Sequence, residues 1–386
     1  MLIFHVILAA AAVVALAARP GTTGGSVVAL AAAGIDIALG AAVDPVIHIV
    51  GPMFVFLAAA LTLAGTLERA GTAERIATAL AGRARGSSYR LYAYVCLVSA
   101  ALTATVSLDG AVVLMVPVLL ALRRYHAPFG SLFLGTVVVA NAFSIAVPQG
   151  NPTNLLIIAR LGIAPTTYLA HMALPGLLAA LMCAGAVAVQ QRRHLAKAYA
   201  PADDTDTATL TRPERTSAAA FAAAALAAWT APFLGLPTWW PFAAAVALVL
   251  IATRTRPATI VPWRIGVQIA STLLVVQAVG NPGLGAVATG LAGLLAAALV
   301  VGAAAALLNN LPVGASAVAL LTTAPLGYAA CIGLAVGSLA TPQGSVATLI
   351  ASELATPDAP SLPVRRFAPL AAAAVAVATL LTWLTL

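Results

Sequence analysis

Charged residues are scarce in this sequence. Only 8% of its 386 residues are Asp, Glu, Lys or Arg, whereas 62% are hydrophobic. A water-soluble domain of this length cannot bury so much apolar surface, so the composition excludes a soluble globular protein and indicates that lipid surrounds most of the chain. The net charge of +8 does not indicate nucleic-acid binding, because the basic residues lie in short gaps between apolar runs.

Metal, disulfide and hydrolase motifs are also lacking. Cys96, Cys183 and Cys331 each lie in an apolar stretch without CxxC or Cys/His spacing, so we expect no disulfide framework, metal site or cofactor. The sequence contains neither HExxH nor GxSxG, and an intramembrane hydrolase built on Asp109 would need a second carboxylate at midplane depth. We therefore expect a protein that is not an enzyme.

Long apolar runs predict the membrane-spanning helices, since a helix needs about 20 apolar residues to cross the bilayer core. Candidate spans cover residues 2–18, 27–43, 46–67, 131–159, 172–190, 217–235, 238–253, 265–279, 325–350 and 367–385. We expect the first to be a span rather than a removed signal peptide, because no positive charge precedes it and Arg19 follows it.

Two further apolar segments, 91–122 and 287–321, are interrupted by polar turns. The turns are Ser107-Leu108-Asp109-Gly110 and Asn309-Asn310-Leu311-Pro312, and the arm after each turn is too short to cross the bilayer. Irregular backbone at membrane depth is tolerated only inside protein or beside a wet cavity. We therefore expect two re-entrant hairpins.

The distribution of basic residues predicts the orientation. Threading these segments through a cell membrane puts every Lys and Arg except Arg160 on one side, which we take as the cytoplasm. Both termini then lie outside, and the polar stretch 192–216 becomes a cytoplasmic linker.

The linker separates two similar halves, 1–191 and 217–386. Each reads as three spans, a hairpin, a span with a polar break (131–159 or 325–350) and a last span, and Pro148–Leu156 aligns with Pro342–Ile350. Because each half contains an odd number of spans, the second half crosses the membrane in the opposite orientation to the first. We expect an all-α polytopic membrane protein with two inverted repeats of five transmembrane helices, each containing one re-entrant hairpin and one broken helix.

The hairpin turns and helix breaks supply the candidate substrate site. A broken helix frees backbone N–H and C=O groups, which bind a solute without a buried formal charge. The alternative is that Pro and Gly only kink these helices and the amides satisfy the freed backbone. The candidate substrate-binding residues are Ser107, Asn141, Gln149, Asn151, Thr153, Asn154, Asn309, Asn310, Thr341, Gln343, Ser345 and Thr348.

Asp109 is the only acidic residue expected near the midplane in a hairpin or break. A carboxylate in a medium of low dielectric constant takes up a proton or pairs with a cation, so Asp109 is the candidate proton-coupling residue. The alternative is a structural acid at an Asp-Gly turn. Neither turn nor break contains Arg or Lys, so a multivalent anion would bind on dipoles and amides alone, and a neutral hydroxyl-bearing solute fits more easily.

These motifs resemble the ArsB-type arsenical pump membrane proteins of the ion-transporter superfamily, which are related to divalent anion/sodium symporters and citrate transporters. The similarity rests on Ser107–Gly110 leading to Val116-Pro117, Gly150–Asn154, Asn309–Pro312 and Gly337–Thr348. The resemblance implies proton-coupled efflux of arsenite and antimonite by an elevator-like movement, a homodimer, and a cytoplasmic arsenite-stimulated ATPase as partner.

The sequence also departs from these relatives. It is shorter than expected for arsenite permeases, and its hairpin tips differ from the Ser-Asn-Thr of sodium-coupled dicarboxylate carriers. An organic-anion or dicarboxylate carrier, a sodium-coupled permease of the same superfamily and a passive anion channel remain alternatives. Thiolate chemistry of Cys331 with arsenite is a further alternative to simple packing.

Overall fold

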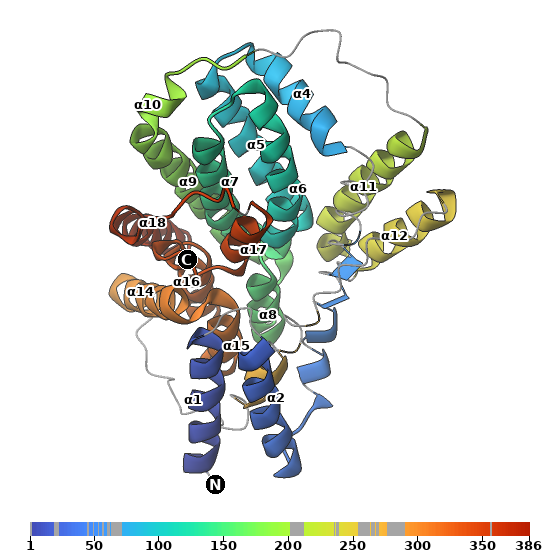
Figure 1. The fold of residues 1–386 in the computed structure, drawn as a ribbon. Coiled ribbons are helices and arrows are strands. Elements are labelled where there is room, and N and C mark those ends of the chain that lie inside the picture. Colours follow the sequence, from blue (N-terminus) through green and yellow to red (C-terminus); the bar gives the residue numbers. More distant parts are fainter. Residues whose placement is uncertain are drawn as a thin grey trace.

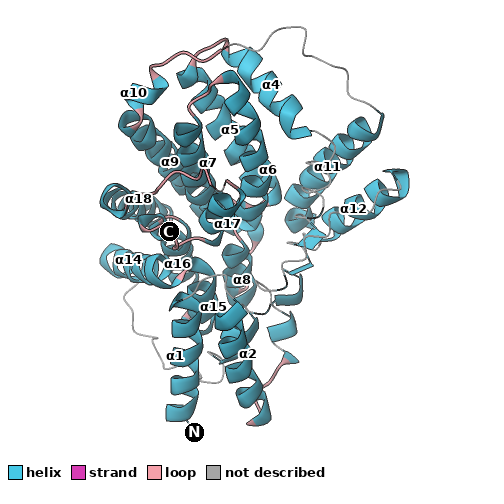
Figure 2. Ribbon diagram, in the orientation of Figure 1, coloured by secondary structure: helices cyan, strands magenta, loops and turns pink. Residues whose placement is uncertain are grey.

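The computed structural model describes most of the chain as α-helix (Figures 1 and 2). The described residues are 2–18, 23–44, 46–48, 50–52, 54–55, 58–59, 62, 72–200, 212–234, 236, 239–253, 263, 267, 270–275, 290–355 and 357–386. Within them, the only β-type pairing is an isolated bridge between Ser87 and Ala198. About half of each of the predicted spans 46–67 and 265–279, part of the linker and residues 287–289 lie outside the described residues.

The helices up to residue 195 follow the apolar runs of the sequence. They are α1 (Leu2–Ala18), α2 (Thr23–Ala38), α4 (Thr72–Ala84), α5 (Ser88–Val106), α6 (Leu108–Ala121), α7 (Phe129–Phe143), α8 (Pro152–Leu161), α9 (Pro165–Gln190) and α10 (Arg192–Leu195). Three short 3-10 helices complete them: η1 (Leu122–Tyr125), η2 (Ser144–Ala146) and η3 (Pro148–Gly150).

A comparable series follows residue 211. It contains α11 (Arg212–Thr230), η5 (Ala231–Leu234), α12 (Trp239–Thr253), α14 (Leu291–Leu308), α15 (Asn310–Leu320), α16 (Ala324–Ala335), η6 (Gly337–Ala340), α17 (Val346–Leu354) and α18 (Val364–Thr385). α14 and α15 are separated by Asn309 alone, as α5 and α6 are separated by Ser107 alone.

Some helices extend beyond the predicted spans. α9 begins at Pro165, seven residues before the predicted start of span 172–190, because proline is well accommodated in the first turn of a helix and its missing N–H costs nothing there. α8 continues to Leu161 and ends at Gly162, whose φ of 63° is the left-handed conformation typical of a helix C-terminus.

Five described segments are long and apolar enough to cross a membrane. They are Ser88–Val106, Phe129–Ala146, Pro165–Gln190, Leu291–Leu308 and Val364–Thr385. Large apolar side chains on these helices are exposed, including Leu97 at 67% and Val300 at 68%. Helices that are apolar on their outer face as well as on their buried face are typical of a polytopic membrane protein.

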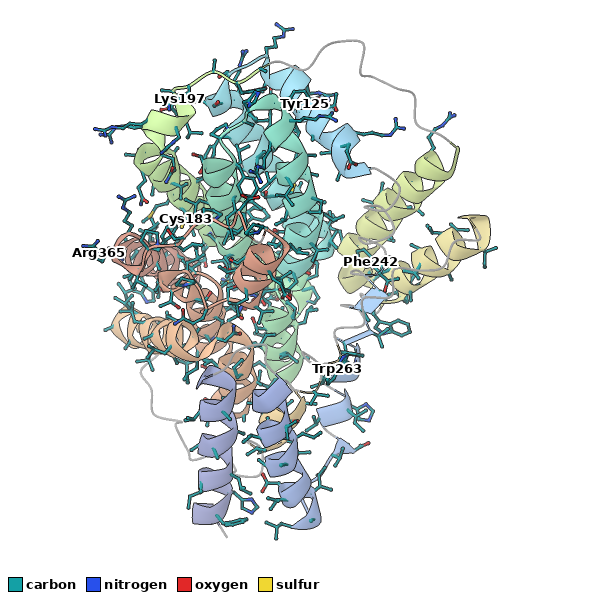
Figure 3. The ribbon with its side chains drawn as sticks, viewed as in Figure 1. Tyr125, Cys183, Lys197, Phe242, Trp263 and Arg365 are labelled. Carbon is teal, nitrogen blue, oxygen red and sulfur yellow. The ribbon has the colours of Figure 1, made fainter. Side chains whose placement is uncertain are left out.

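The helices form a central body with two peripheral pairs. α1 and α2 pack together at the bottom of Figure 1, α11 and α12 pack together at its right, and the remaining long helices make up the body. In the first pair, His5 Nδ1 lies 2.6 Å from a carboxylate oxygen of Asp36, which is fully buried. In the body, Cys183 on α9 lies inside the bundle, whereas Arg365 lies at the periphery (Figure 3).

α7 is deeply buried in the body, because every residue from 131 to 142 is buried. It packs against α5, α6 and α9. Its polar Thr136 accepts a hydrogen bond from Ser99 of α5 at 3.3 Å, so the hydroxyl is satisfied inside the core. This packing holds the end of α7, and the polar segment that follows it, at the centre of the protein.

Candidate substrate site

Two single-residue turns lie between α5 and α6 and between α14 and α15. Ser107 and Asn309 both have positive φ, 108° and 84°, which non-glycine residues rarely adopt. The Ser107 hydroxyl accepts from the Gly110 N–H at 3.4 Å, and the Asn309 side-chain oxygen accepts from the Leu311 N–H at 3.1 Å. Each turn residue therefore caps the helix that follows it.

The first helix break lies between α7 and α8 and is held by two asparagines. The Asn154 Nδ2 donates to the carbonyl oxygens of Ser144 at 2.8 Å and Val147 at 3.2 Å. Asn151 is the N-cap of α8, and its side-chain oxygen accepts from the Thr153 N–H at 3.1 Å and the Thr153 hydroxyl at 2.9 Å. The break is therefore a compact structure stabilised by its own side chains.

The second break, between α16 and α17, has the same local geometry. Gly344 packs on the Ser338 carbonyl as Gly150 packs on the Ser144 carbonyl, so closely that a Cβ at either glycine would overlap the oxygen. The following N-cap residues adopt similar conformations: φ −141° and ψ 135° at Asn151, φ −122° and ψ 133° at Ser345.

The second break is held by the second turn. The Asn309 Nδ2 donates to the Gln343 carbonyl at 2.9 Å, and the Asn310 N–H donates to the Gly344 carbonyl at 2.8 Å. The Asn310 side-chain oxygen accepts from the Val346 N–H at 3.2 Å, and the Thr341 hydroxyl donates to the Ala306 carbonyl. These contacts place the beginnings of α15 and α17 together.

The first break is joined to the first hairpin in a comparable way. The Gln149 Nε2 donates to the Ala104 carbonyl in the last turn of α5 at 2.9 Å, close to the Ser107 turn. The start of α8 therefore lies near the start of α6.

The two halves of the chain pack crosswise at this centre. α6 packs against α17, and α8 packs against α15 (Figure 1). Gly314 on α15 lies so close to α8 that an added Cβ would come within 2.7 Å of a Thr153 methyl carbon. Four helices of 14, 10, 11 and 9 residues, namely α6, α8, α15 and α17, therefore begin in one region. Helix N-termini carry partial positive charge and unpaired N–H groups.

Several polar atoms in this region are buried without a partner. Within the described residues, the Asn151 Nδ2 and the Ser345 hydroxyl, on residues 1% and 0% exposed, form no hydrogen bond. The side-chain oxygens of Asn141 and Asn154 are likewise unpaired, although both amide nitrogens are used. Buried unpaired groups are rare in native proteins, and bonding to a ligand or water is one explanation for such a cluster.

Asp109 lies in the first turn of α6 and is 4% exposed. Within the described part of the chain, its carboxylate has no hydrogen bond and no cationic partner. The ion pairs described involve other residues: His5 with Asp36, His48 with Asp44, and Arg123 with Asp358.

The remaining predicted site residues differ in their roles. Asn141 is in the last turn of α7 and donates to the Val137 carbonyl at 2.9 Å. Gln343 contributes its backbone carbonyl to the contact with Asn309. Thr348 is 1% exposed in the first turn of α17.

The residue pattern did not predict three residues as part of the site. Gly150 and Gly344 were recognised only as motif residues, and their close contacts with carbonyl oxygens require the folded break. Tyr168 on α9 donates from its hydroxyl to the Ile145 carbonyl in the first break at 3.0 Å. No spacing or motif in the sequence links Tyr168 to this break.

Comparison with known proteins agrees with this architecture. An all-helical protein whose apolar helices carry polar breaks at their buried centre is typical of membrane transporters rather than enzymes. The family model described as CitMHS, citrate transporter, matches residues 1–333. The chain belongs to this family and is a multi-pass secondary transporter of the ion-transporter superfamily. No curated protein matches the chain.

The family match bears on the predicted substrate. It confirms the expected superfamily and gives no support to the arsenical type. The matched residues include both turns and the first break, whereas Thr341, Gln343, Ser345 and Thr348 follow the matched segment.

Proposed function

We propose that this protein is a proton-coupled carrier of a small, multivalent organic anion of the citrate class. The anion binds where α6, α8, α15 and α17 begin. The observation that supports this most directly is the meeting of four helix N-termini beside two buried, unpartnered donors, the Asn151 Nδ2 and the Ser345 hydroxyl. Each N-terminus carries about half a positive charge, so four supply roughly two charges without Lys or Arg.

The helix N-termini can attract an anion although the turns and breaks contain no basic residue. Oriented N–H dipoles in a water-excluded site bind carboxylates as direct hydrogen-bond donors. They also avoid burying a formal positive charge, which is expensive at membrane depth. The family match, whose description names citrate, points to the same class of substrate.

Asp109 is the proposed proton carrier. A negative carboxylate in the first turn of α6 would repel a bound anion, and protonation removes this repulsion. Proton binding and anion binding therefore favour each other, and by linkage each raises the affinity for the other to the same extent. The expected coupling is symport of proton and anion.

The paired geometry of the breaks and turns supports two repeats, 1–191 and 217–386, in inverted orientation. Gly150 with Ser144 and Gly344 with Ser338 are matched pairs, as are the Ser107 and Asn309 turns. Location in the cell membrane with both termini outside, a homodimer and a cytoplasmic ATPase partner stay predictions from the sequence.

Arsenite efflux is the second candidate. The lining favours it, because this lining consists of amides and hydroxyls apart from Asp109. Arsenite at neutral pH is an uncharged trihydroxide, and such groups can form hydrogen bonds with it. A neutral solute gains little from four helix N-termini, so the organic anion is the better match.

Transport by purified protein in liposomes tests both candidates. We expect an inwardly directed proton gradient to drive accumulation of radiolabelled citrate, and a protonophore to abolish it. Asp109→Asn removes the titratable group, so it should lose gradient-driven accumulation but keep citrate–citrate exchange. Asp44→Asn is the matched control, because Asp44 is exposed and pairs with His48 away from the proposed site.

The outcomes separate the alternatives. Protonophore-sensitive accumulation by Asp109→Asn would refute Asp109 as the proton carrier. Movement of arsenite without movement of citrate or other carboxylates would select the second candidate. Citrate uptake that requires sodium and ignores the proton gradient would identify a sodium-coupled permease.

A further inference from the structure

α9 forms the wall behind the first helix break. Gly176 permits this contact, because an added Cβ would lie 2.6 Å from the Ala146 nitrogen. Tyr168, two turns earlier on the same helix, is fully buried and donates from its hydroxyl to the Ile145 carbonyl at 3.0 Å. α9 therefore contacts the backbone of η2 through packing and through a hydrogen bond.

The carbonyl groups of this break are largely occupied. Asn154 donates to the carbonyls of Ser144 and Val147, and Tyr168 donates to that of Ile145. Carbonyl oxygens carry partial negative charge, so an unoccupied one facing the site would repel an anion. Among these donors, only Tyr168 comes from outside the break and α8.

A second tyrosine offers a comparison within the same cluster. The ring of Tyr328 on α16 meets that of Tyr168 edge to face, with centroids 5.9 Å apart. The Tyr328 hydroxyl is buried and has no hydrogen-bond partner among the residues that the structure describes. The two residues share ring packing and burial but differ in whether the hydroxyl contacts the break.

We propose that Tyr168 is a positioning residue for substrate binding: its hydroxyl holds the Ile145 carbonyl away from the site, so that the first break presents hydrogen-bond donors to an anion. This inference rests on the proposed organic-anion function. The ring of Tyr328 links Tyr168 to α16, the helix that leads into the second break.

The test compares Tyr168→Phe with Tyr328→Phe in liposomes. Each variant removes one hydroxyl and keeps the ring. Tyr168→Phe frees the Ile145 carbonyl, and we expect the apparent KM for citrate to rise about tenfold with little change in maximal rate. Tyr328→Phe removes a hydroxyl that bonds to nothing, so its KM should match wild type. A general loss of folded protein would instead lower the maximal rate.

Hydrogen–deuterium exchange supplies a readout that does not depend on the substrate. Peptides covering residues 144–151 should exchange faster in Tyr168→Phe than in wild type or Tyr328→Phe. An unchanged KM in Tyr168→Phe, or an equal rise in both variants, would overturn the inference. If the wild-type protein transports no carboxylate, the proposed function is wrong. Hydrogen–deuterium exchange then decides the role of Tyr168 by itself: faster exchange in Tyr168→Phe supports its contact with the break, and unchanged exchange overturns it.

Discussion

Replacing Gly344 by alanine tests whether the second break depends on close backbone contact. An added Cβ at this position would overlap the Ser338 carbonyl oxygen and lie 3.0 Å from the Ala306 Cα. Both neighbours are backbone atoms, which cannot rotate away as a side chain would. Overpacking of this kind costs about 1–3 kcal/mol, and we expect the upper part of that range.

The assay is thermal unfolding of the purified variant in detergent, followed by citrate transport in liposomes. Gly344→Ala should melt several degrees below wild type and lose most transport. Gly150→Ala should behave alike, because its Cβ would overlap the Ser144 carbonyl in the same way. Gly185→Ala is the matched control: its Cβ would meet nothing within 4 Å, so helix propensity alone should raise stability by up to about 1 kcal/mol. Equal melting temperatures for Gly344→Ala and Gly185→Ala would refute the reasoning.

Three further predictions concern residues outside the turns and helix breaks. Cys331→Ser should keep transport, since Cys331 is buried packing and serine can bond to the preceding helical turn; complete loss of transport would contradict this. Asp358→Asn should change the unfolding free energy by less than about 1 kcal/mol, because its pair with Arg123 is about half exposed. His5→Leu should lower the melting temperature more than the double variant His5→Leu/Asp36→Leu does, because the single change leaves a buried carboxylate without its partner. Thermal unfolding measures both variants, and the opposite order would contradict this reasoning.

The sequence pattern predicted the helices well where polar punctuation interrupts an apolar run. Ser107 and Asn309 stand at the observed helix ends, and α7 ends and α8 begins inside the predicted span 131–159. Such helix ends can be recognised from the local sequence, because proline, glycine and polar residues within an apolar run indicate a turn or a break in the helix. The start of α9 was predicted less accurately, because Thr166, Thr167 and His171 interrupt the apolar pattern in the first turns of this helix.

The composition of the site was predictable only in part. The amides of Asn151 and Asn154 are recognisable as polar groups at membrane depth, but the crosswise packing of α6 on α17 and α8 on α15 joins segments far apart in the sequence. The meeting of four helix N-termini, which we propose as the anion site, does not follow from a count of charged residues, and that count favours a neutral solute. The motif most similar to arsenite permeases, Gly337–Thr348, also lies beyond the residues that match the citrate transporter family.

Because of the crosswise packing, the region where the four helices begin is formed by both halves of the chain. α6 lies against a helix from the second half, and α15 lies against a helix from the first. We therefore expect a shift of one hairpin to carry the opposing broken helix with it. Alternating exposure to the two sides of the membrane would then be a displacement of both hairpins together, and this stays a prediction.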